Sequence, residues 1–129
     1  MSCSMIERGD RIRPDLKVGK LARLAISTYI ESENRDPAEI VRLQDGDYCH
    51  QTFGLNSTVP VLVPVAVIEN APTGIHVGEA GFYHAHYWTS VWSVDDDEYR
   101  IVNDWKEPPN PRDNRTPLED WIRQMGLDL

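Results

Sequence analysis

Apolar residues recur every three or four positions between Asp15 and Ser32, whereas the basic residues of this segment lie largely on the opposite side. Residues three or four positions apart share one face of a helix, so the pattern predicts a single amphipathic helix. The residues expected on its inner face are Val18, Leu21, Leu24, Ala25, Thr28 and Tyr29.

Two shorter helices are expected to follow. The segment Asp36-Pro37-Ala38-Glu39 has the form of a capping box with proline at the first helical position, and it predicts a helix from Pro37 to about Gln44. Asp47 can cap a third helix, from Tyr48 to Phe53, which Gly54 would end in a left-handed conformation. The buried positions expected in the second helix are Ile40, Val41 and Leu43.

The rest of the chain contains strand patterns and one more helix. The apolar run from Val59 to Ile68 predicts an edge strand, because its two prolines have the same parity and remove donors from one side only. From Gly81 onward, FYHAHYWTSVWSV and EYRIVNDW are typical of the two arms of a long hairpin. Thr116-Pro117-Leu118-Glu119 is a second capping box, and it predicts a closing helix to Met125.

Three helices, an edge strand, a long antiparallel hairpin and a C-terminal helix indicate an α+β fold. The length of 129 residues suits one domain, with residues 1–14 as a lead-in that we expect to be mobile. Three helices before a hairpin is also the order of a winged-helix module. In that arrangement the third helix, with Tyr48, Cys49, His50 and Gln51, would be the recognition helix, and the hairpin with Trp88 would be the wing.

The charge of the chain is unevenly distributed. A net charge of −8 opposes non-specific affinity for nucleic acid or an anionic membrane surface. The segment from Glu7 to Arg23 nevertheless contains six basic and three acidic residues, so it carries +3 and the remainder −11. A solvated helix face is the simplest interpretation, but any contact with nucleic acid should involve this segment. The candidate residues are Arg11, Arg13, Lys17, Lys20 and Arg23.

The cysteines and the N-terminus favour a cytoplasmic protein. Cys3 and Cys49 do not form the dense cysteine framework of a small secreted domain. Glu7 and Arg8 interrupt the only apolar stretch near the N-terminus, so no signal peptide is expected. The uncharged stretch 49–67 contains prolines and amides, which argues against a membrane span and against a membrane partner.

Several segments of the chain match a known pattern in order and character: KVGKLAR, AEIVRLQDGDYCHQTFGLN, YRIVNDW, PRDNRTPLEDWI and MGL. The chain thereby resembles a small module of bacterial restriction and defence-associated proteins, where it is often a C-terminal appendage. The resemblance covers most of the chain, although VPVLVPVAVIENAPTG departs from it. It implies a structural unit that accompanies effector proteins and has no catalytic residues of its own. The matching positions are Glu39, Leu43, Asp45, Tyr48, Thr52, Phe53, Gly54, Leu55, Asn56, Trp105 and Trp121.

Candidate catalytic or metal-binding chemistry is sparse. His84 and His86 would share a strand face and could hold one ion together with Cys49-His50, yet no further ligand spacing supports such a site. Cys49 could act as a nucleophile only if a histidine converged on it from far along the chain. The acidic run from Asp95 to Glu98 lacks the ligand spacing of a calcium loop and is typical of a solvated turn. We therefore expect no catalytic residue, no metal and no cofactor.

The aromatic residues of the predicted hairpin are the best functional lead. Both faces of this hairpin would carry bulky rings, so a sheet with one buried face would expose one row of them. Tyrosine and tryptophan beside polar atoms are the composition of interaction hot spots, although the last helix could also cover them. The residues predicted to bind a protein partner are Tyr83, Tyr87, Trp88 and Trp92.

Taken together, these patterns favour a non-catalytic module that binds protein, or nucleic acid through its basic first helix, in prokaryotic defence or DNA transactions. One alternative is an acidic inhibitor encoded by a phage or plasmid, which imitates nucleic acid with Asp95 to Glu98. A third hypothesis is a small metalloprotein or hydrolase centred on Cys49, His84 and His86.

Overall fold

The computed structural model describes residues 12–13, 15–107 and 113–127, so most of the expected lead-in lies outside the described residues. The described chain forms six helices and a three-stranded antiparallel sheet, which confirms the α+β class. None of these six helices combines the length and apolar character needed to cross a bilayer. The helices are α2 (Val18–Ile30), α3 (Pro37–Arg42), α4 (Gly46–Phe53), α5 (Val65–Glu69), α6 (Ala80–His86) and α7 (Arg115–Gln124). The strands are β1 (Leu62–Pro64), β2 (Trp92–Val94) and β3 (Asp97–Ile101).

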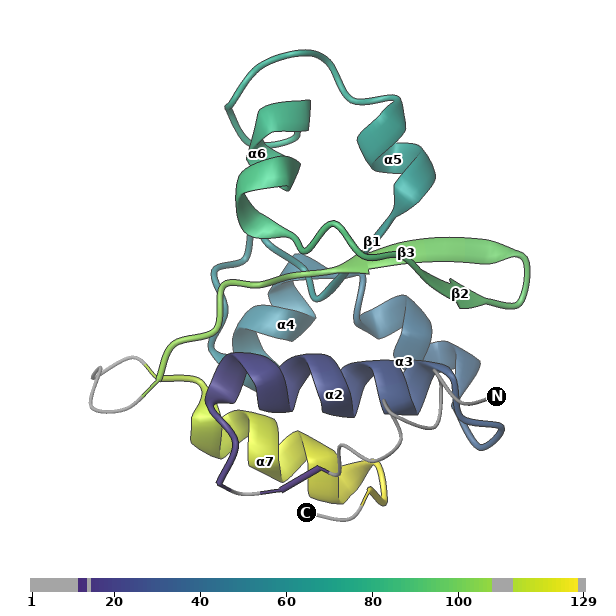
Figure 1. The fold of residues 1–129 in the computed structure, drawn as a ribbon, viewed down its shortest axis with the longest axis vertical. Helices are drawn as coiled ribbons and strands as arrows, with labels where there is room; N and C mark the ends of the chain where they lie inside the picture. Colours follow the sequence, from purple (N-terminus) through teal and green to yellow (C-terminus); the bar gives the residue numbers. More distant parts are fainter. Residues whose placement is uncertain (1–11, 14, 108–112, 128–129) are drawn as a thin grey trace.

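The sheet separates two groups of helices (Figure 1). On one side α2, α3, α4 and α7 form what we call the body, which also includes the sheet. On the other side α5, α6 and their connection form what we call the upper lobe, residues 65–87. The main core lies in the body, where Leu21, Phe53, Leu118 and Ile122 are fully buried.

Helix α2 is the predicted amphipathic helix, somewhat shorter than expected at both ends. Its buried face includes Leu21, Ala25 and Tyr29, as predicted. Thr28 is exposed, so its assignment to the inner face is wrong. The larger apolar side chains of Ile26 and Ile30 turn the buried face away from position 28, because burying them removes more apolar surface from water. Ala22 is also fully buried on this helix.

Aspartate caps begin α3 and α4. Asp36 accepts a backbone N–H bond at 2.9 Å and begins α3, as predicted. Helix α4 begins earlier than predicted, at Gly46, because Asp45 rather than Asp47 is its cap. The Asp45 carboxylate accepts the Asp47 N–H at 2.9 Å. Gly54 ends α4 with φ at 77°, a left-handed conformation that favours glycine, as the sequence predicted.

Glu39 lies in the core and does not complete the predicted capping box. Its carboxylate is 2% exposed and accepts bonds from the Tyr48 hydroxyl at 2.6 Å, the Trp121 indole at 2.9 Å and Arg42 at 2.8 Å. Three donors outweigh the single N–H that a capping box offers. Burial and the bond to Glu39 raise the pKa of Tyr48 to about 12. With Glu39 turned inward on α3, Val41 points outward and is 67% exposed, contrary to its predicted burial.

The predicted edge strand is partly right. Strand β1 is at the edge of the sheet, since the order is β1-β3-β2, and Leu62 pairs with Ile101 of β3. The apolar run does not continue as a strand, however, because Val65 begins α5. Pro64 marks the change: its ring fixes φ at a value compatible with a helix start, and it cannot donate to a ladder.

The first arm of the predicted long hairpin is wrong, because residues 80–86 form α6. Aromatic alternation along this segment also fits helical spacing, in which residues four positions apart meet. The rings of Phe82 and His86 are 4.5 Å apart, and those of Tyr83 and Tyr87 are 5.8 Å apart. Of the predicted first arm, Trp92–Val94 forms a strand paired with β3, and Tyr87 and Trp88 add an isolated bridge and one backbone bond to the second arm.

The closing helix α7 is confirmed, although it begins at Arg115 with Asn114 as its N-cap rather than at the predicted Thr116 box. The buried Asn114 side chain accepts the Lys106 N–H at 2.7 Å and donates to the Phe53 carbonyl at 2.9 Å. These long-range bonds fix the helix start where a purely local cap cannot.

The structure does not expose the surfaces with which a winged-helix module would contact its ligand. Cys49 of α4, expected on the recognition helix, is fully buried, and Tyr48 is half-buried against Glu39. His50 and Gln51 remain exposed. The expected long wing is replaced by α6 and the short β2–β3 hairpin, so its aromatic residues are not presented as a wing would present them.

Candidate binding groove

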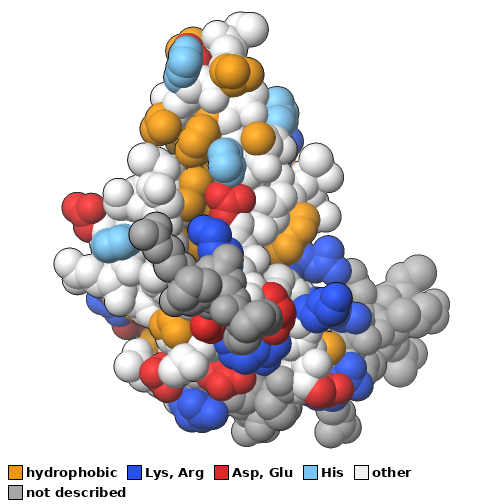
Figure 2. All heavy atoms as spheres, turned by 90° about the vertical axis from the view of Figure 1, so that its left-hand side faces the viewer, with side chains coloured by type: hydrophobic (Ala, Val, Ile, Leu, Met, Phe, Trp, Pro, Cys, Tyr) orange, Lys and Arg blue, Asp and Glu red, His pale blue; other side chains and the backbone are white. Residues whose placement is uncertain are grey.

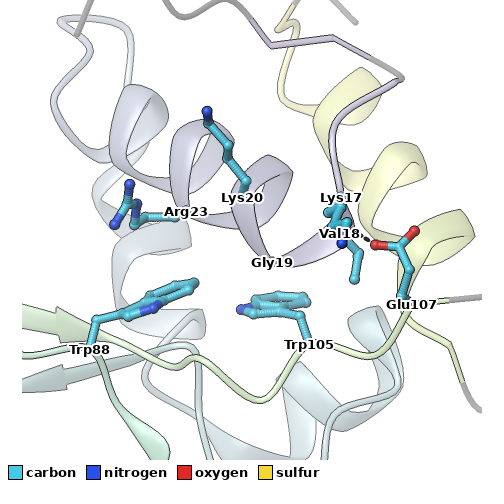
Figure 3. A pocket seen from close by; sticks show the side chains of 8 residues that line it. All are labelled: Lys17, Val18, Gly19, Lys20, Arg23, Trp88, Trp105 and Glu107. Atoms are coloured by element: carbon cyan, nitrogen blue, oxygen red, sulfur yellow. Dashed lines mark hydrogen bonds between the residues drawn. The ribbon is translucent and has the colours of Figure 1, made fainter.

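A groove of about 530 Å³ lies between α2 and the chain segments that follow α6 and β3 (Figure 3). The start of α2 forms one wall, and two indole rings form the floor. Clefts of this size are typical of sites for small ligands or for short pieces of a polymer. The residues that line it are Lys17, Val18, Gly19, Lys20, Arg23, Trp88, Trp105 and Glu107.

Trp88 and Trp105 lie side by side because backbone bonds join their segments. Tyr87 and Val102 form an antiparallel bridge. The Trp88 N–H donates to the Ile101 carbonyl at 3.0 Å. This pairing places both rings beneath α2, although the two tryptophans are far apart in the sequence.

Both rings are held in place while remaining half-buried rather than enclosed. The Trp105 indole N–H donates to the Val102 carbonyl at 2.8 Å, and its ring meets Phe53 edge-on at 5.6 Å. The Arg23 guanidinium carbon lies 5.7 Å from the centre of the Trp88 ring, a cation–π distance. The floor is therefore organised before any ligand arrives.

The basic residues of the groove come from one stretch of α2 and the residue before it. Lys17, Lys20 and Arg23 are three positions apart, so their side chains leave neighbouring parts of one helix side. All three are exposed. Figure 3 shows Arg23 above Trp88, while Lys20 extends on the side of the helix away from the rings and so lies at the rim. Figure 2 shows basic side chains spread over the body, interspersed with acidic ones.

Glu107 closes one end of the groove. Its carboxylate accepts the Val18 N–H in the first turn of α2 (dashed in Figure 3) and pairs with Arg115 at 3.0 Å. The backbone bond from Val18, followed by the bond to Arg115, lowers the pKa of Glu107. The Glu107 carboxylate, the acidic group of the described lining, is therefore engaged by Val18 and Arg115, and the charge of Lys17 also lowers its pKa.

Gly19 leaves open space above the rings. Apart from its chain neighbours and the nearby backbone of α2, no atom lies within 4 Å of the position that a Cβ would occupy at this residue. Because Gly19 lines the groove on the α2 wall, any larger side chain would enter it. A glycine early in a helix gives up some helix stability, and here it leaves room between helix and indoles.

A histidine–carboxylate pair supports the floor from outside the groove. His86 Nδ1 lies 2.6 Å from Asp104 Oδ2, which joins the end of α6 to the segment that carries Trp105. Both partners are about one-third exposed, so the pair is solvated. It adds a side-chain link to the backbone pairing that positions Trp88 and Trp105.

The residues predicted to bind a protein partner separate in the structure. Tyr87 is 1% exposed, and its hydroxyl donates to the Pro60 carbonyl at 2.5 Å, so its assignment as an exposed binding residue is wrong. Tyr83 and Trp92 are half-buried, pack against the core and do not line the groove. Trp88 alone of the four lines it.

The predicted basic residues divide differently. The structure brings Lys17, Lys20 and Arg23 together at the groove. Arg13 is exposed, lies outside the lining and pairs with Asp15 at 3.3 Å. Arg11 lies outside the described residues.

Sequence reasoning missed Trp105, Gly19 and Glu107 as groove residues. The sequence distinguishes Trp105 only as a position that matches the resemblance to defence-associated modules. Its position beside Trp88 depends on the pairing of Tyr87 with Val102, which lie on the two predicted hairpin arms, but the sequence did not predict that α2 lies above this pairing. Gly19 could have been noticed as a glycine within a strongly periodic helical segment.

The cysteine and histidine hypotheses receive no geometric support. Cys49 is fully buried, burial raises the pKa of its thiol to about 12, and a protonated thiol is a poor nucleophile or ligand. His84 and His86 lie two positions apart on α6, so they do not share a face as they would on a strand. His50 Nδ1 lies 2.8 Å from the Leu55 carbonyl. In the described residues, no three His, Cys, Asp or Glu side chains gather to hold a metal ion.

Comparison with known proteins finds no matching family model, no matching curated protein and no matching solved structure. The function of the groove is therefore argued from its own chemistry.

Proposed function

We propose that this protein is a non-catalytic module that binds nucleic acid through the groove between α2 and the two tryptophans. The observation that carries the proposal is the juxtaposition of three exposed cations from one helix with two half-buried indole rings. Phosphate groups recruit lysine and arginine, and nucleobases pack on aromatic rings. A nucleotide has both chemical groups, and the groove offers a partner for each.

The net charge of −8 limits what the groove can bind. A protein with this charge repels a long polyanion, so the attraction must come from the local cluster of cations. Three cations that neutralise three phosphates should give a logarithmic slope of affinity against salt of about −2 for a single strand. The proposal is thus a short contact of modest affinity, steeply weakened by salt.

We assign no catalytic step to the groove. Its carboxylate, Glu107, is held by Val18 and Arg115, and the other polar side chains in the described lining are cations and indoles. The sequence resemblance to modules of restriction and defence-associated proteins supports an accessory role in such a setting, in which the module would bring an effector to nucleic acid. The proposal therefore includes a protein partner, the effector that the module would bring to nucleic acid.

Fluorescence anisotropy with a labelled DNA strand of about 16 nucleotides tests this function. Wild-type protein should bind at about 50 mM salt and lose affinity with the slope given above as salt rises to about 200 mM. Lys20→Glu should weaken binding about tenfold or more at low salt, because it replaces an attracting charge with a repelling one.

Arg123→Glu is the matched control, because it changes the net charge equally at an exposed position on α7 outside the groove lining. It should weaken binding far less than Lys20→Glu. Equal effects of the two variants would show that only overall charge matters, and an absence of binding at low salt would refute the proposal.

The acidic turn between β2 and β3 supports a second candidate function, an inhibitor that imitates nucleic acid. All four residues from Asp95 to Glu98 are exposed, and Arg35 engages only Asp95, at 2.8 Å, among the described ion pairs of this turn. Neutralising Asp96 and Asp97 should slow association with a basic target protein. An unchanged association rate would exclude this role for the turn.

A further inference from the structure

We infer that the ligand of the groove is an unpaired strand whose bases stack on Trp88 and Trp105. This inference rests on the proposed function and makes it narrower: it distinguishes single strands from duplexes and from free nucleotides.

The floor of the groove presents ring surfaces rather than hydrogen-bonding edges. The indole N–H of Trp105 is already donated to the Val102 carbonyl, so this ring can offer mainly its apolar surface. The Arg23 guanidinium lies over the Trp88 ring at cation–π distance, so a base that stacks on this face takes the place of the guanidinium. Such surfaces recognise the faces of bases and not their sequence-specific edges.

Base faces are accessible only in unpaired nucleic acid. In a duplex each base is covered above and below by its neighbours, so a protein reaches the edges in the grooves and the phosphates. A groove with tryptophans on its floor and cations on its wall therefore fits a strand with splayed bases better than a double helix. Two indoles side by side suit at least two nucleotides, more than one free nucleotide provides.

Gly19 supplies the space that stacking requires. A base above the indoles must fit beneath the first turn of α2, and a Cβ at position 19 would meet no atom within 4 Å beyond its chain neighbours and the nearby helix backbone. The open volume is therefore on the ring side of the wall, where the strand would lie. An acidic peptide with aromatic side chains could use the same chemistry, but it does not repeat anion and ring in every unit as a nucleic acid strand does.

The test compares four labelled or competing probes with the wild-type protein at low salt: a thymidine strand of about 16 nucleotides, a duplex of the same length, an abasic strand and thymidine monophosphate. The intact strand should bind at least about fivefold tighter than the abasic strand or the duplex, because each stacked base adds affinity. Thymidine monophosphate should compete only weakly.

Three variants locate the effect. Trp88→Ala should reduce affinity for the intact strand at least about fivefold and leave affinity for the abasic strand nearly unchanged. Gly19→Leu should do the same by filling the groove, and it favours a folded helix because leucine is a better helix former than glycine. Trp92→Ala is the control, since this half-buried tryptophan does not line the groove.

The outcomes separate the two proposals. Equal, salt-sensitive binding of strand, duplex and abasic strand that Lys20→Glu abolishes would overturn the stacking inference and leave the proposed function standing. Equal affinity for thymidine monophosphate would overturn the inference in favour of a nucleotide site. Failure of every nucleic acid to bind, while an acidic aromatic peptide binds and Trp88→Ala abolishes that binding, would overturn both.

Discussion

The upper lobe and the groove of the body are both rich in aromatic rings, but they use them differently. In the upper lobe Tyr87 is enclosed, and the rings around it contact one another. In the body Trp88 and Trp105 stay half-buried beside the cations of α2. No lysine or arginine occurs between Arg42 and Arg100, so the lobe has neither of these basic residues. Aromatic content alone therefore does not mark a binding surface; its combination with charge does.

The upper lobe does expose apolar side chains. Val67, Ile75 and Val77 are 47%, 79% and 61% exposed, and Figure 2 shows hydrophobic side chains along this part of the molecule. Nothing in the described structure indicates what would cover them. The groove, by contrast, has a wall, a floor and a charge that together define the chemistry of a ligand.

The largest expected effect is a difference in stability between alanine variants of two adjacent aromatic residues. Tyr87→Ala should lower the free energy of unfolding by about 4 kcal/mol, because it leaves a cavity in the core and an unpaired Pro60 carbonyl. Trp88→Ala should cost about 1 kcal/mol or less and act mainly on binding. Urea denaturation of both variants measures the difference. A larger loss for Trp88→Ala would show that its ring is structural and would break the comparison.

The next effect concerns the carboxylate that organises the body. Glu39→Ala should lower the free energy of unfolding by about 3 kcal/mol, because it leaves the Trp121 indole and the Tyr48 hydroxyl without their acceptor. Glu39→Gln keeps an acceptor oxygen and should lose less. Val41→Ala, at an exposed position on the same helix, is the control and should change stability by less than about 0.5 kcal/mol. Comparable losses for Glu39→Ala and Val41→Ala would contradict the buried role of the carboxylate.

The smallest effect is a pH dependence at the end of the groove. The pKa of Glu107 is lowered in the folded state from its ordinary value of 4.5 by the bond from Val18 and by Arg115. The Glu107 charge therefore contributes fully to the free energy of unfolding above the pKa of the unfolded state. This contribution is lost as pH falls through the pKa of the folded state. Glu107→Gln should lower the free energy of unfolding at pH 7 by less than about 1 kcal/mol, because the side chain is 40% exposed. The Tm of the variant should therefore be slightly below that of the wild type.

The Tm difference between wild type and Glu107→Gln should shrink as pH falls from about 6 through the ordinary pKa of 4.5. Asp120→Asn, at an exposed position on α7, controls for the general effect of removing a carboxylate. A difference that stays constant over this range would contradict the proposed role of the Glu107 charge.

Local signals predicted much of the body. The periodicity of α2, the cap at Asp36 and the left-handed Gly54 each depend on a few neighbouring residues, and the structure confirms them. The same signals misled at α6, because alternating and helical spacing overlap in a short aromatic segment. In this segment, contacts between rings four positions apart, such as Tyr83 and Tyr87, favour the helix.

The candidate groove was only half predictable. Lys17, Lys20 and Arg23 are evident from charge and spacing within one helix. Trp105 lines the groove because the paired segments that carry Trp88 and Trp105 lie beneath α2, and Glu107 lines it through a bond to the start of α2. Such non-local contacts leave no local pattern, so only the fold reveals them.

The most direct test of the groove as the ligand site is the NMR spectrum of the four indole N–H groups during titration with the thymidine strand. Tryptophan-to-phenylalanine variants assign the signals of Trp88, Trp92, Trp105 and Trp121. The account predicts shifts for Trp88 and Trp105, with Trp92 and the buried Trp121 unchanged. Saturable binding that shifts Trp92 alone, or that leaves Trp88 and Trp105 unmoved, would contradict it.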